Sequence, residues 1–454
     1  MMTGRAWGVI AILAIAIVAG TSIWLRCEGT PPEIHAPESL VLGRSGAAVT
    51  VKASDPRSGV RSLTVRLRHA GGEAVLADES YPGNLLTGGV LRPEVPPVEA
   101  TLVPKTLGLR EGEAFLVVSA SDWSWASFFT GNRRVVEIPI TVDLAPPRLS
   151  VESGLTYVQR GGSAAVVYRL GEPTSRDGVL VGDTFFPGAA LPGDGGDRRA
   201  AIFAVPRDAD ADPKIRVIAE DAAGNQASRS WATRFKERSF QEVAIRLGNS
   251  FLGGKVPELR DALSDRFELD QEDPVAAFQV INRDVRASNE EEIRGIVARG
   301  KPPRAFQGRF LQLRNSAVTS RFAEHRTYLV EGRKVSEAIH YGYDLASTAG
   351  AGVEAANAGR VIFADQLGIY GNCVLLDHGL GVSSLYAHLS RIDVGPGDEV
   401  EKGAILGTSG ATGLAGGDHL HFAILVGETY VDPKEWWDPR WVRDHIDEKL
   451  GSAP

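Results

Sequence analysis

Two histidine motifs near the C-terminus have the residue types and spacing of metal ligands. His340 and Asp344 are four residues apart, and His419 and His421 are two apart. Residues two apart in a strand point to the same face, so His419 and His421 project from one side of the apolar run Leu420–Val426. Burying two imidazole rings there costs free energy unless a partner satisfies their nitrogens. A bound metal ion would be such a partner.

The chemistry of these side chains points to zinc. His340 and Asp344 share a face if their segment is extended, and an imidazole and a carboxylate are both common Zn²⁺ ligands. A third ligand from the His419/His421 pair leaves one tetrahedral position for water, as in catalytic zinc sites. His388 and the remaining histidine of the pair could then act as a general base or stabilise an oxyanion. Spacing alone does not decide which of His419 and His421 binds the metal.

None of these motifs is decisive by itself, although the His419/His421 pair is moderately suggestive. A His-x-x-x-Asp pair is more often a polar surface feature than a metal site, and His388 alone carries no pattern. Their occurrence together in one predicted β domain is a much stronger signal, because the fold can bring separate strands of one domain to a common site. The hypothesis of a zinc centre therefore depends on the set of residues.

Short strands and glycine turns must position these side chains. Residues 359–364, 372–376 and 382–386 are short apolar or β-branched runs, which are typical of strands. We expect a compact antiparallel β domain over residues 306–440, followed by a C-terminal tail over 441–454.

Two further β domains are predicted upstream, at residues 38–145 and 146–235. Apolar and polar residues alternate over 60–68, the period of a half-buried strand. Each domain ends a strand on an aspartate that is followed by a Gly-Asn turn, which indicates a repeat: Asp122 with Gly131-Asn132, and Asp221 with Gly224-Asn225. We interpret both as immunoglobulin-like β-sandwiches, which would act as spacers or contact an envelope protein partner.

Residues 236–305 change to a helical pattern and are predicted to form a connector. Asp273-Pro274 is a favourable helix start. Ser288-Asn289-Glu290-Glu291 matches a capping box, which predicts that another helix opens there and ends near Gly300.

The N-terminal residues 1–30 contain a predicted membrane anchor. Ala6–Leu25 is free of charged residues, and such a run is long enough to span a bilayer as a helix. Arg5 before the run favours a cytoplasmic N-terminus, so a single pass through the bacterial inner membrane would place the rest in the periplasm or outside the cell. A cleaved signal peptide is the alternative, because Val18-Ala19-Gly20 offers small residues for cleavage.

Composition excludes some functions and favours a mostly β, multidomain protein. The chain has 454 residues, 43% of them hydrophobic and 23% charged, with 51 glycines and 25 prolines. This mixture is typical of globular domains with many turns. The net charge is −8 and no dense basic stripe is present, so nucleic acid is not an expected partner.

The C-terminal motifs resemble those of the lysostaphin/LytM family of zinc peptidases. The resemblance covers roughly residues 306–440 and consists of several motifs that occur in a fixed order. These are His340-x-x-x-Asp344, Gly359–Ala364, Tyr370-Gly371-Asn372, Asp377-His378-Gly379, Tyr386-Ala387-His388-Leu389, Val394–Val400, Gly407–Gly413 and His419–Phe422. One departure is Ala323 in Ser320-Arg321-Phe322-Ala323, where many relatives have glycine.

The resemblance implies a fold, a cofactor and a reaction. It implies an antiparallel sheet with a groove over Zn²⁺, held by His340, Asp344 and His421, with His388 and His419 as catalytic residues that do not bind the metal. It also implies an endopeptidase that hydrolyses peptide cross-links of bacterial peptidoglycan with a metal-bound water. We expect a D,D bond in direct cross-links as the target.

Two other functions remain open at this point. Some members of the family have lost zinc ligands and activate cell-wall amidases or scaffold envelope proteins. The β-sandwiches could also make adhesion the main function. Either the long N-terminal region or the connector could cover the groove and inhibit it.

Overall fold

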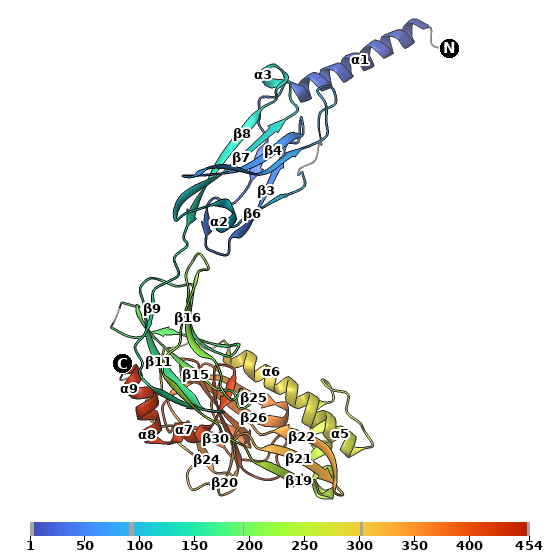
Figure 1. Cartoon of the computed structure of the whole chain (residues 1–454). Coiled ribbons are helices and arrows are strands. Elements are labelled where there is room, and N and C mark those ends of the chain that lie inside the picture. The colour runs from blue at the N-terminus through green and yellow to red at the C-terminus, as the bar shows by residue number, and fades with distance from the viewer. Residues whose placement is uncertain (1–3, 90–94, 194, 300–302, 452–454) are drawn as a thin grey trace. The chain divides into compact units, whose positions relative to one another are not determined.

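The computed structural model describes residues 4–89, 95–193, 195–299 and 303–451, and it confirms a mostly β, multidomain protein (Figure 1). The chain divides into two units. The first consists of residues 1–147 with 220–226, and the second of residues 148–219 with 227–454.

The first unit is a two-layer β-sandwich with its own core. Its five-stranded sheet has the order β2-β8-β7-β4-β5, and its three-stranded sheet has the order β1-β3-β6. Alternate residues of β4, such as Leu63, Val65 and Leu67, are fully buried against the other sheet. The elements are β1 (Glu33–His35), β2 (Leu40–Leu42), β3 (Ala47–Ser54), β4 (Val60–His69), β5 (Gly72–Ser80), β6 (Val98–Leu102), α2 (Pro104–Leu107), β7 (Gly112–Asp122), α3 (Ala126–Phe129) and β8 (Arg133–Val142).

The N-terminal segment forms helix α1 (Gly4–Arg26). Within the part of the chain that the structure describes, no helix combines the length and apolar character that crossing a membrane requires. The predicted transmembrane anchor over Ala6–Leu25 is therefore not supported by the structure.

The second unit begins with another set of short strands. They form four-stranded sheets in the orders β14-β15-β11-β9 and β13-β12-β16-β17, and a β10-β18 pair. The strands are β9 (Leu149–Val151), β10 (Thr156–Gln159), β11 (Ser163–Leu170), β12 (Arg176–Val181), β13 (Thr184–Pro187), β14 (Ala189–Ala190), β15 (Arg198–Ala204), β16 (Ile215–Glu220), β17 (Gln226–Arg229) and β18 (Thr233–Lys236).

The repeated Asp and Gly-Asn motif adopts the same hydrogen bonding in both copies. The backbone and side-chain amides of Asn132 donate to Asp122 at 2.8 and 2.9 Å, and those of Asn225 donate to Asp221 at 2.9 Å each. Both preceding glycines have positive φ, 87° at position 131 and 79° at position 224. The shared motif therefore reflects a shared turn.

A strand and a helical segment follow. They are β19 (Glu242–Arg246), η1 (Phe251–Lys255), α4 (Val256–Leu263), α5 (Pro274–Val280), η2 (Ile281–Val285) and α6 (Arg286–Val297). Asp273 caps α5 as predicted, because its side chain accepts hydrogen bonds from the N–H groups of Val275 and Ala276. We call residues 236–299 the connector.

The predicted helix start at Ser288–Glu291 is wrong. α5, the π turn η2 and α6 form one uninterrupted helical segment from Pro274 to Val297. Asn289 and Glu290 therefore lie inside α6 and are buried. Asn289 Oδ1 accepts from Ile369 N at 2.9 Å, and Glu290 Oε1 accepts from Tyr370 Oη at 2.5 Å. Polar residues that resemble a cap in the sequence instead accept hydrogen bonds from the next domain, from a backbone N–H group and from a tyrosine hydroxyl.

An antiparallel sheet forms the C-terminal domain. Its order is β20-β23-β31-β27-β26-β25-β29, with β32 beside β31, and small sheets β19-β21-β22 and β24-β30-β28 accompany it. The strands are β20 (Ala317–Ser320), β21 (His325–Val330), β22 (Arg333–Ile339), β23 (Tyr343–Ala346), β24 (Gly352–Glu354), β25 (Gly359–Leu367), β26 (Gly371–Asp377), β27 (Val382–Leu389), β28 (Arg391–Ile392), β29 (Glu399–Val400), β30 (Ile405–Thr408), β31 (Leu420–Val426) and β32 (Thr429–Val431). The chain continues through α7 (Pro433–Trp437), α8 (Pro439–Val442), η4 (Arg443–Asp447) and α9 (Glu448–Leu450).

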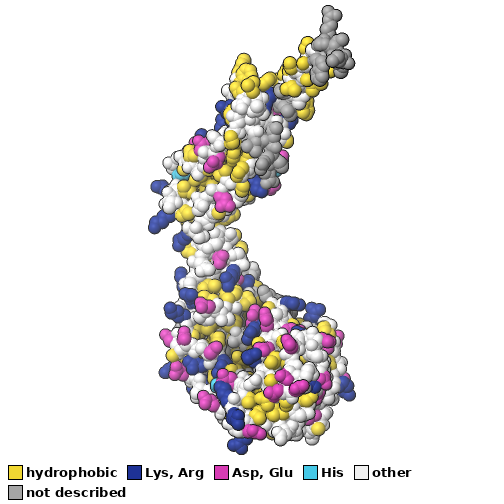
Figure 2. Space-filling view, turned by 90° about the vertical axis from the view of Figure 1, so that its right-hand side faces the viewer, with side chains coloured by type: hydrophobic (Ala, Val, Ile, Leu, Met, Phe, Trp, Pro, Cys, Tyr) yellow, Lys and Arg dark blue, Asp and Glu magenta, His cyan; other side chains and the backbone are white. Residues whose placement is uncertain are grey.

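Charged side chains are mixed on the face shown in Figure 2. Basic and acidic groups alternate there, and neither sign gathers into a stripe.

Candidate active site

Neighbouring strands bring Asp344 and His421 together. Asp344 of β23 pairs directly with His421 of β31 in the antiparallel sheet, and directly paired residues have their side chains on one face. His340 follows β22, and its backbone is fixed by two hydrogen bonds. Its N–H donates to Glu324 O at 3.0 Å, and its carbonyl accepts from Ala323 N at 2.7 Å.

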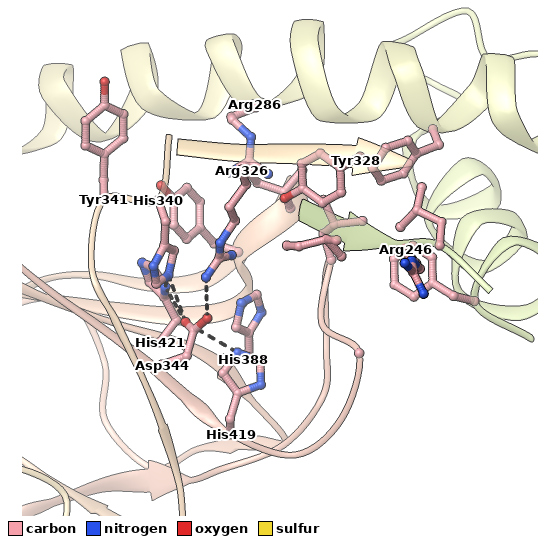
Figure 3. A pocket seen from close by; sticks show the side chains of 18 residues that line it. Arg246, Arg286, Arg326, Tyr328, His340, Tyr341, Asp344, His388, His419 and His421 are labelled. Carbon is pink, nitrogen blue, oxygen red and sulfur yellow. Dashed lines mark hydrogen bonds and ion pairs between the residues drawn. The ribbon is translucent and has the colours of Figure 1, made fainter. Parts of the chain in front are cut away.

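Three ligand-type atoms converge at this point (Figure 3). His340 Nε2 lies 2.9 Å from Asp344 Oδ1 and 3.0 Å from His421 Nδ1, and the latter two atoms are 3.0 Å apart. All three residues are buried, with 5 to 8% of each exposed. The predicted ligand set His340, Asp344 and His421 therefore forms one buried cluster.

The donor set fits a divalent metal ion. His340 Nδ1 lies 2.9 Å from Arg321 O; a carbonyl oxygen only accepts, so Nδ1 carries the proton and Nε2 presents a lone pair to the cluster. His421 Nε2 is buried and has no hydrogen-bond partner among the described residues, so His421 is held from its Nδ1 side. Two imidazoles and one carboxylate that face a common point can coordinate a divalent cation and leave one coordination position open.

An unusual backbone conformation turns His388 toward the cluster. The residue before it, Ala387, pairs with His421, so simple alternation along β27 would point His388 to the opposite face. However, His388 has a φ of 64°, which breaks the alternation. Its ring centroid lies 5.9 Å from that of His421 and 4.8 Å from that of His419. Its Nδ1 donates to Thr412 O at 2.8 Å, which leaves Nε2 as a proton acceptor.

His419 lies just before β31 and faces the same carboxylate. Its Nδ1 donates to Gly417 O at 2.8 Å, and its Nε2 lies 3.6 Å from Asp344 Oδ1. Burial lowers the pKa of His388 well below its usual range. Burial also acts to lower the pKa of His419, but the hydrogen bond and charge of Asp344 outweigh it and raise that pKa. The two remaining histidines therefore differ in their tendency to hold a proton.

Arg326 holds the second oxygen of Asp344. Its Nη2 donates to Asp344 Oδ2 at 2.9 Å, and Glu324 Oε2 pairs with the same guanidinium at 3.3 Å. Burial alone would raise the pKa of Asp344, but the charge of His340 and hydrogen bonds from the three histidines hold it well below its usual range. Sequence reasoning missed Arg326, because a single arginine after His325 has no spacing that marks it.

Two small residues make this geometry possible. A Cβ atom at Gly342 would lie 2.7 Å from His421 Cε1 and 2.8 Å from His421 Nε2, so a side chain there would displace the ring. Ala323, the position where the sequence departs from the expected glycine, has a φ of 62°. Left-handed conformations are unfavourable for residues with a Cβ, so glycine would be less strained there.

A cavity of about 320 Å³ opens beside the cluster. His340, Asp344, His388, His419 and His421 all line it. The connector lines it too, with side chains that sequence reasoning did not connect to the site: Ile245, Arg246, Leu247, Phe251, Phe278 and Arg286.

The sequence of this region matches a known family. Residues 338–433 match the sequence model described as Peptidase family M23. The match includes His340, Asp344, His388, His419 and His421.

Individual relatives match over the same part of the chain. A DD-carboxypeptidase/endopeptidase, Mpg, of Neisseria meningitidis serogroup B is 38% identical over 95 residues, which are 21% of this chain and 22% of that protein. The peptidoglycan DD-endopeptidase ShyB of Vibrio cholerae is 36% identical over 115 residues, 25% of this chain and 26% of that protein. The chain thus spans about a quarter or less of the length of these curated relatives. Among solved structures, the catalytic domain of lysostaphin from Staphylococcus simulans is 29% identical, with 29% of this chain and 98% of that one covered and a TM-score of 0.25.

Proposed function

We propose, from the match of residues 338–433 to Peptidase family M23, that the protein is a zinc-dependent endopeptidase that hydrolyses peptide cross-links of bacterial peptidoglycan. The convergence of His340 Nε2, Asp344 Oδ1 and His421 Nδ1 within 3.0 Å of one another carries the proposal. Three such ligands and an open position suit zinc that activates water. The name of the Vibrio cholerae relative, a peptidoglycan DD-endopeptidase, supports peptidoglycan as the substrate.

The residues of the cluster divide into two roles in this proposal. His340, Asp344 and His421 would hold Zn²⁺, which supplies Lewis-acid chemistry and lowers the pKa of water when it is bound. His388, with a free Nε2, accepts a proton from the attacking water. His419, whose pKa is raised, donates a hydrogen bond to the carbonyl oxygen as negative charge develops on it. Arg326 fixes the carboxylate of Asp344.

The intact cluster favours hydrolysis over the role of a silent amidase activator. A relative that has lost its ligands would not need two further histidines beside the cluster. In this chain all five side chains are present and lie on one cavity.

Mass spectrometry of products from purified peptidoglycan tests the function and identifies the bond that is cut. We expect cleaved cross-links with the wild-type chain. His388→Ala should lower the rate at least a hundredfold and leave the zinc content unchanged, whereas Asp344→Ala should lose zinc, as elemental analysis would show. Undiminished hydrolysis by His388→Ala would contradict its proposed role.

We also propose that the peptidase domain works in the periplasm or outside the cell, where peptidoglycan lies. A fusion to a reporter enzyme that is active only outside the cytoplasm should be active. Extraction of the full chain with alkaline carbonate, followed by its intact mass, tests the predicted anchor separately. A chain that is extracted at full length would contradict the anchor.

A further inference from the structure

The connector forms a fixed wall of the cavity beside the ligand cluster. β19 pairs in parallel with β21, so that Arg246 lies opposite Leu329. The ring of Phe278 in α5 packs edge-on against Tyr328 of β21 at a centroid distance of 5.2 Å. These contacts belong to the hydrophobic core of the second unit. The wall is therefore a permanent part of the site, and side chains on it can contact a substrate.

The lining of this cavity carries an excess of positive charge. Among the described lining residues, Arg246, Arg286 and Arg326 are opposed by one carboxylate, that of Asp344. Arg326 is bound to Asp344 and Glu324. Arg246 and Arg286 form no ion pair with any residue that the structure describes, and both lie around the cavity in Figure 3. Two guanidinium groups on the wall are thus available to an anion.

Arg286 is held in place by a buried amide. Its Nη2 donates to Asn282 Oδ1 at 2.8 Å and its Nε to Asn282 O at 3.2 Å. Asn282 is itself anchored to β22, because its Nδ2 donates to Ser336 Oγ at 2.7 Å. Glu290, one turn further along α6, is occupied by the Tyr370 hydroxyl. The guanidinium of Arg286 is therefore pre-positioned by hydrogen bonds to a neutral partner, and its charge acts on the nearby Glu290 carboxyl without forming an ion pair with it.

We infer that Arg246 and Arg286 form a subsite for a free carboxylate on the substrate residue that supplies the leaving amine. This inference rests on the proposed peptidase function, and it assigns a specificity role to connector residues. Guanidinium groups bind carboxylates through charge-assisted, often bidentate hydrogen bonds. A carboxylate bound here would balance the charge of the wall while the scissile carbonyl lies at the ligand cluster.

The subsite distinguishes between classes of peptide bond. In a D,D bond, whether in a direct cross-link or in an uncross-linked D-Ala-D-Ala end, the residue on the leaving side has a free α-carboxylate. In a glycine bridge the corresponding carboxyl group is itself part of a peptide bond. The structure therefore favours D,D bonds over glycyl bonds as substrates of this chain.

A matched pair of substrates tests the inference on the full-length protein. Stem pentapeptides that end in D-Ala-D-Ala would be compared as the free acid and as the C-terminal amide, with kcat/KM measured for each. We expect the wild type to prefer the acid at least tenfold, since a hydrogen bond to a charged group is worth about that factor. Arg246→Gln and Arg286→Gln should each lose about tenfold on the acid, and the double variant about a hundredfold, with little change on the amide.

Control variants separate recognition from folding. Arg283→Gln removes an exposed arginine of the same helical segment that is paired with Asp284 and does not line the cavity, and it should leave both rates unchanged. Arg246→Lys, which keeps the charge, should retain most of the acid preference. An equal loss on acid and amide in the Gln variants would overturn the inference, as would a wild type without preference.

A binding measurement keeps this test separate from the proposed function. Titration calorimetry with the His388→Ala variant should show tighter binding of the acid than of the amide, and Arg286→Gln in that background should abolish the difference. If the wild type hydrolyses no peptide, the proposed function fails, and the binding preference still supports or contradicts the subsite.

Discussion

The two β-sandwich regions share a turn motif but differ in how their cores are built. The first, in residues 1–147, closes its own core between two sheets. The strands of the second, β9 to β18, share one continuous core with the connector and the peptidase domain. The Asp122–Asn132 and Asp221–Asn225 turns are nonetheless alike. Similar local sequence can therefore occur either in a separate unit or in strands that share their core with the candidate site.

Specific contacts join the second sandwich to the peptidase domain. Gly161 O accepts from Asp432 N at 2.8 Å, Glu435 Oε2 accepts from Ser163 N at 2.9 Å, and Lys449 Nζ donates to Ala165 O at 2.9 Å. Buried polar contacts of this kind are costly to leave unsatisfied. We conclude that the second sandwich is part of the fold that supports the candidate site.

Truncation gives the largest expected effect. A chain that begins at residue 144 should stay soluble and keep its hydrolytic rate within about twofold, because the core of the second unit remains whole. A chain that begins at residue 237 should be insoluble or inactive, because it exposes buried groups such as Trp436 and Glu435. A soluble and active chain from residue 237 would show that the second sandwich is dispensable.

Trp436→Ala tests the same comparison with a point change. Trp436 is fully buried against Phe306 and Phe310, and its indole N–H donates to Ser163 Oγ at 3.1 Å. We expect a loss of about 3–5 kcal/mol in the thermal transition of the second unit by calorimetry, with the first unit unchanged. Val65→Ala in β4 is the matched control and should shift only the other transition. Coupled shifts in both would contradict separate units.

Glu435→Gln should change how stability depends on pH. Burial raises the pKa of Glu435 to about 8, from an ordinary value of 4.5. Between pH 4.5 and 8, Glu435 is protonated in the folded state but ionised in the unfolded state. Its protonation therefore stabilises the fold fully below pH 4.5, and this stabilisation is lost as the pH rises towards 8. Denaturant titrations should show the variant gaining stability relative to wild type over this window.

The titration of Lys449 does not overlap the pH range of the Glu435→Gln measurement. Burial lowers its pKa to about 8 from 10.5, so its effect on stability changes between pH 8 and 10.5. A difference between Glu435→Gln and wild type that stays constant from pH 5 to 8 would contradict the raised pKa.

Ala323→Gly gives the smallest expected effect. Because Ala323 has a φ of 62°, glycine should relieve about 1 kcal/mol of backbone strain in the second unit. Its transition should rise by a few degrees by calorimetry, and that of the first unit should not move. A loss of stability would mean that the entropy of the unfolded chain outweighs the strain.

The grouping of His340, Asp344, His419 and His421 was the part of the site that sequence could predict, because these residues lie in two short motifs. Strand pairing places Asp344 beside His421, whereas the choice of His421 over His419 as a ligand came from the family resemblance and stays a prediction. The mostly β architecture followed in the same way from alternation within strands. Sequence patterns predict structure where the interactions that determine it lie within one strand or one short motif.

The missed features depend on contacts between distant segments. The orientation of His388 comes from a positive φ that alternation contradicts. Arg326 acts through Asp344, eighteen residues away. Asn289 and Glu290 look like a cap because the sequence does not show that Ile369 and Tyr370 pack beside them. In each case tertiary structure overrides a local preference.

The π turn η2 sets the rotational phase of α6. Successive residues of an α-helix are about 100° apart around its axis. Deleting one residue between Ile281 and Val285 would therefore rotate all of α6 by about that angle and carry Arg286, Asn289 and Glu290 away from their partners. In this segment a change of helical phase would be more damaging than most substitutions, even though no functional side chain is lost. Insertions and deletions there should therefore be tolerated far less than in the loops around it.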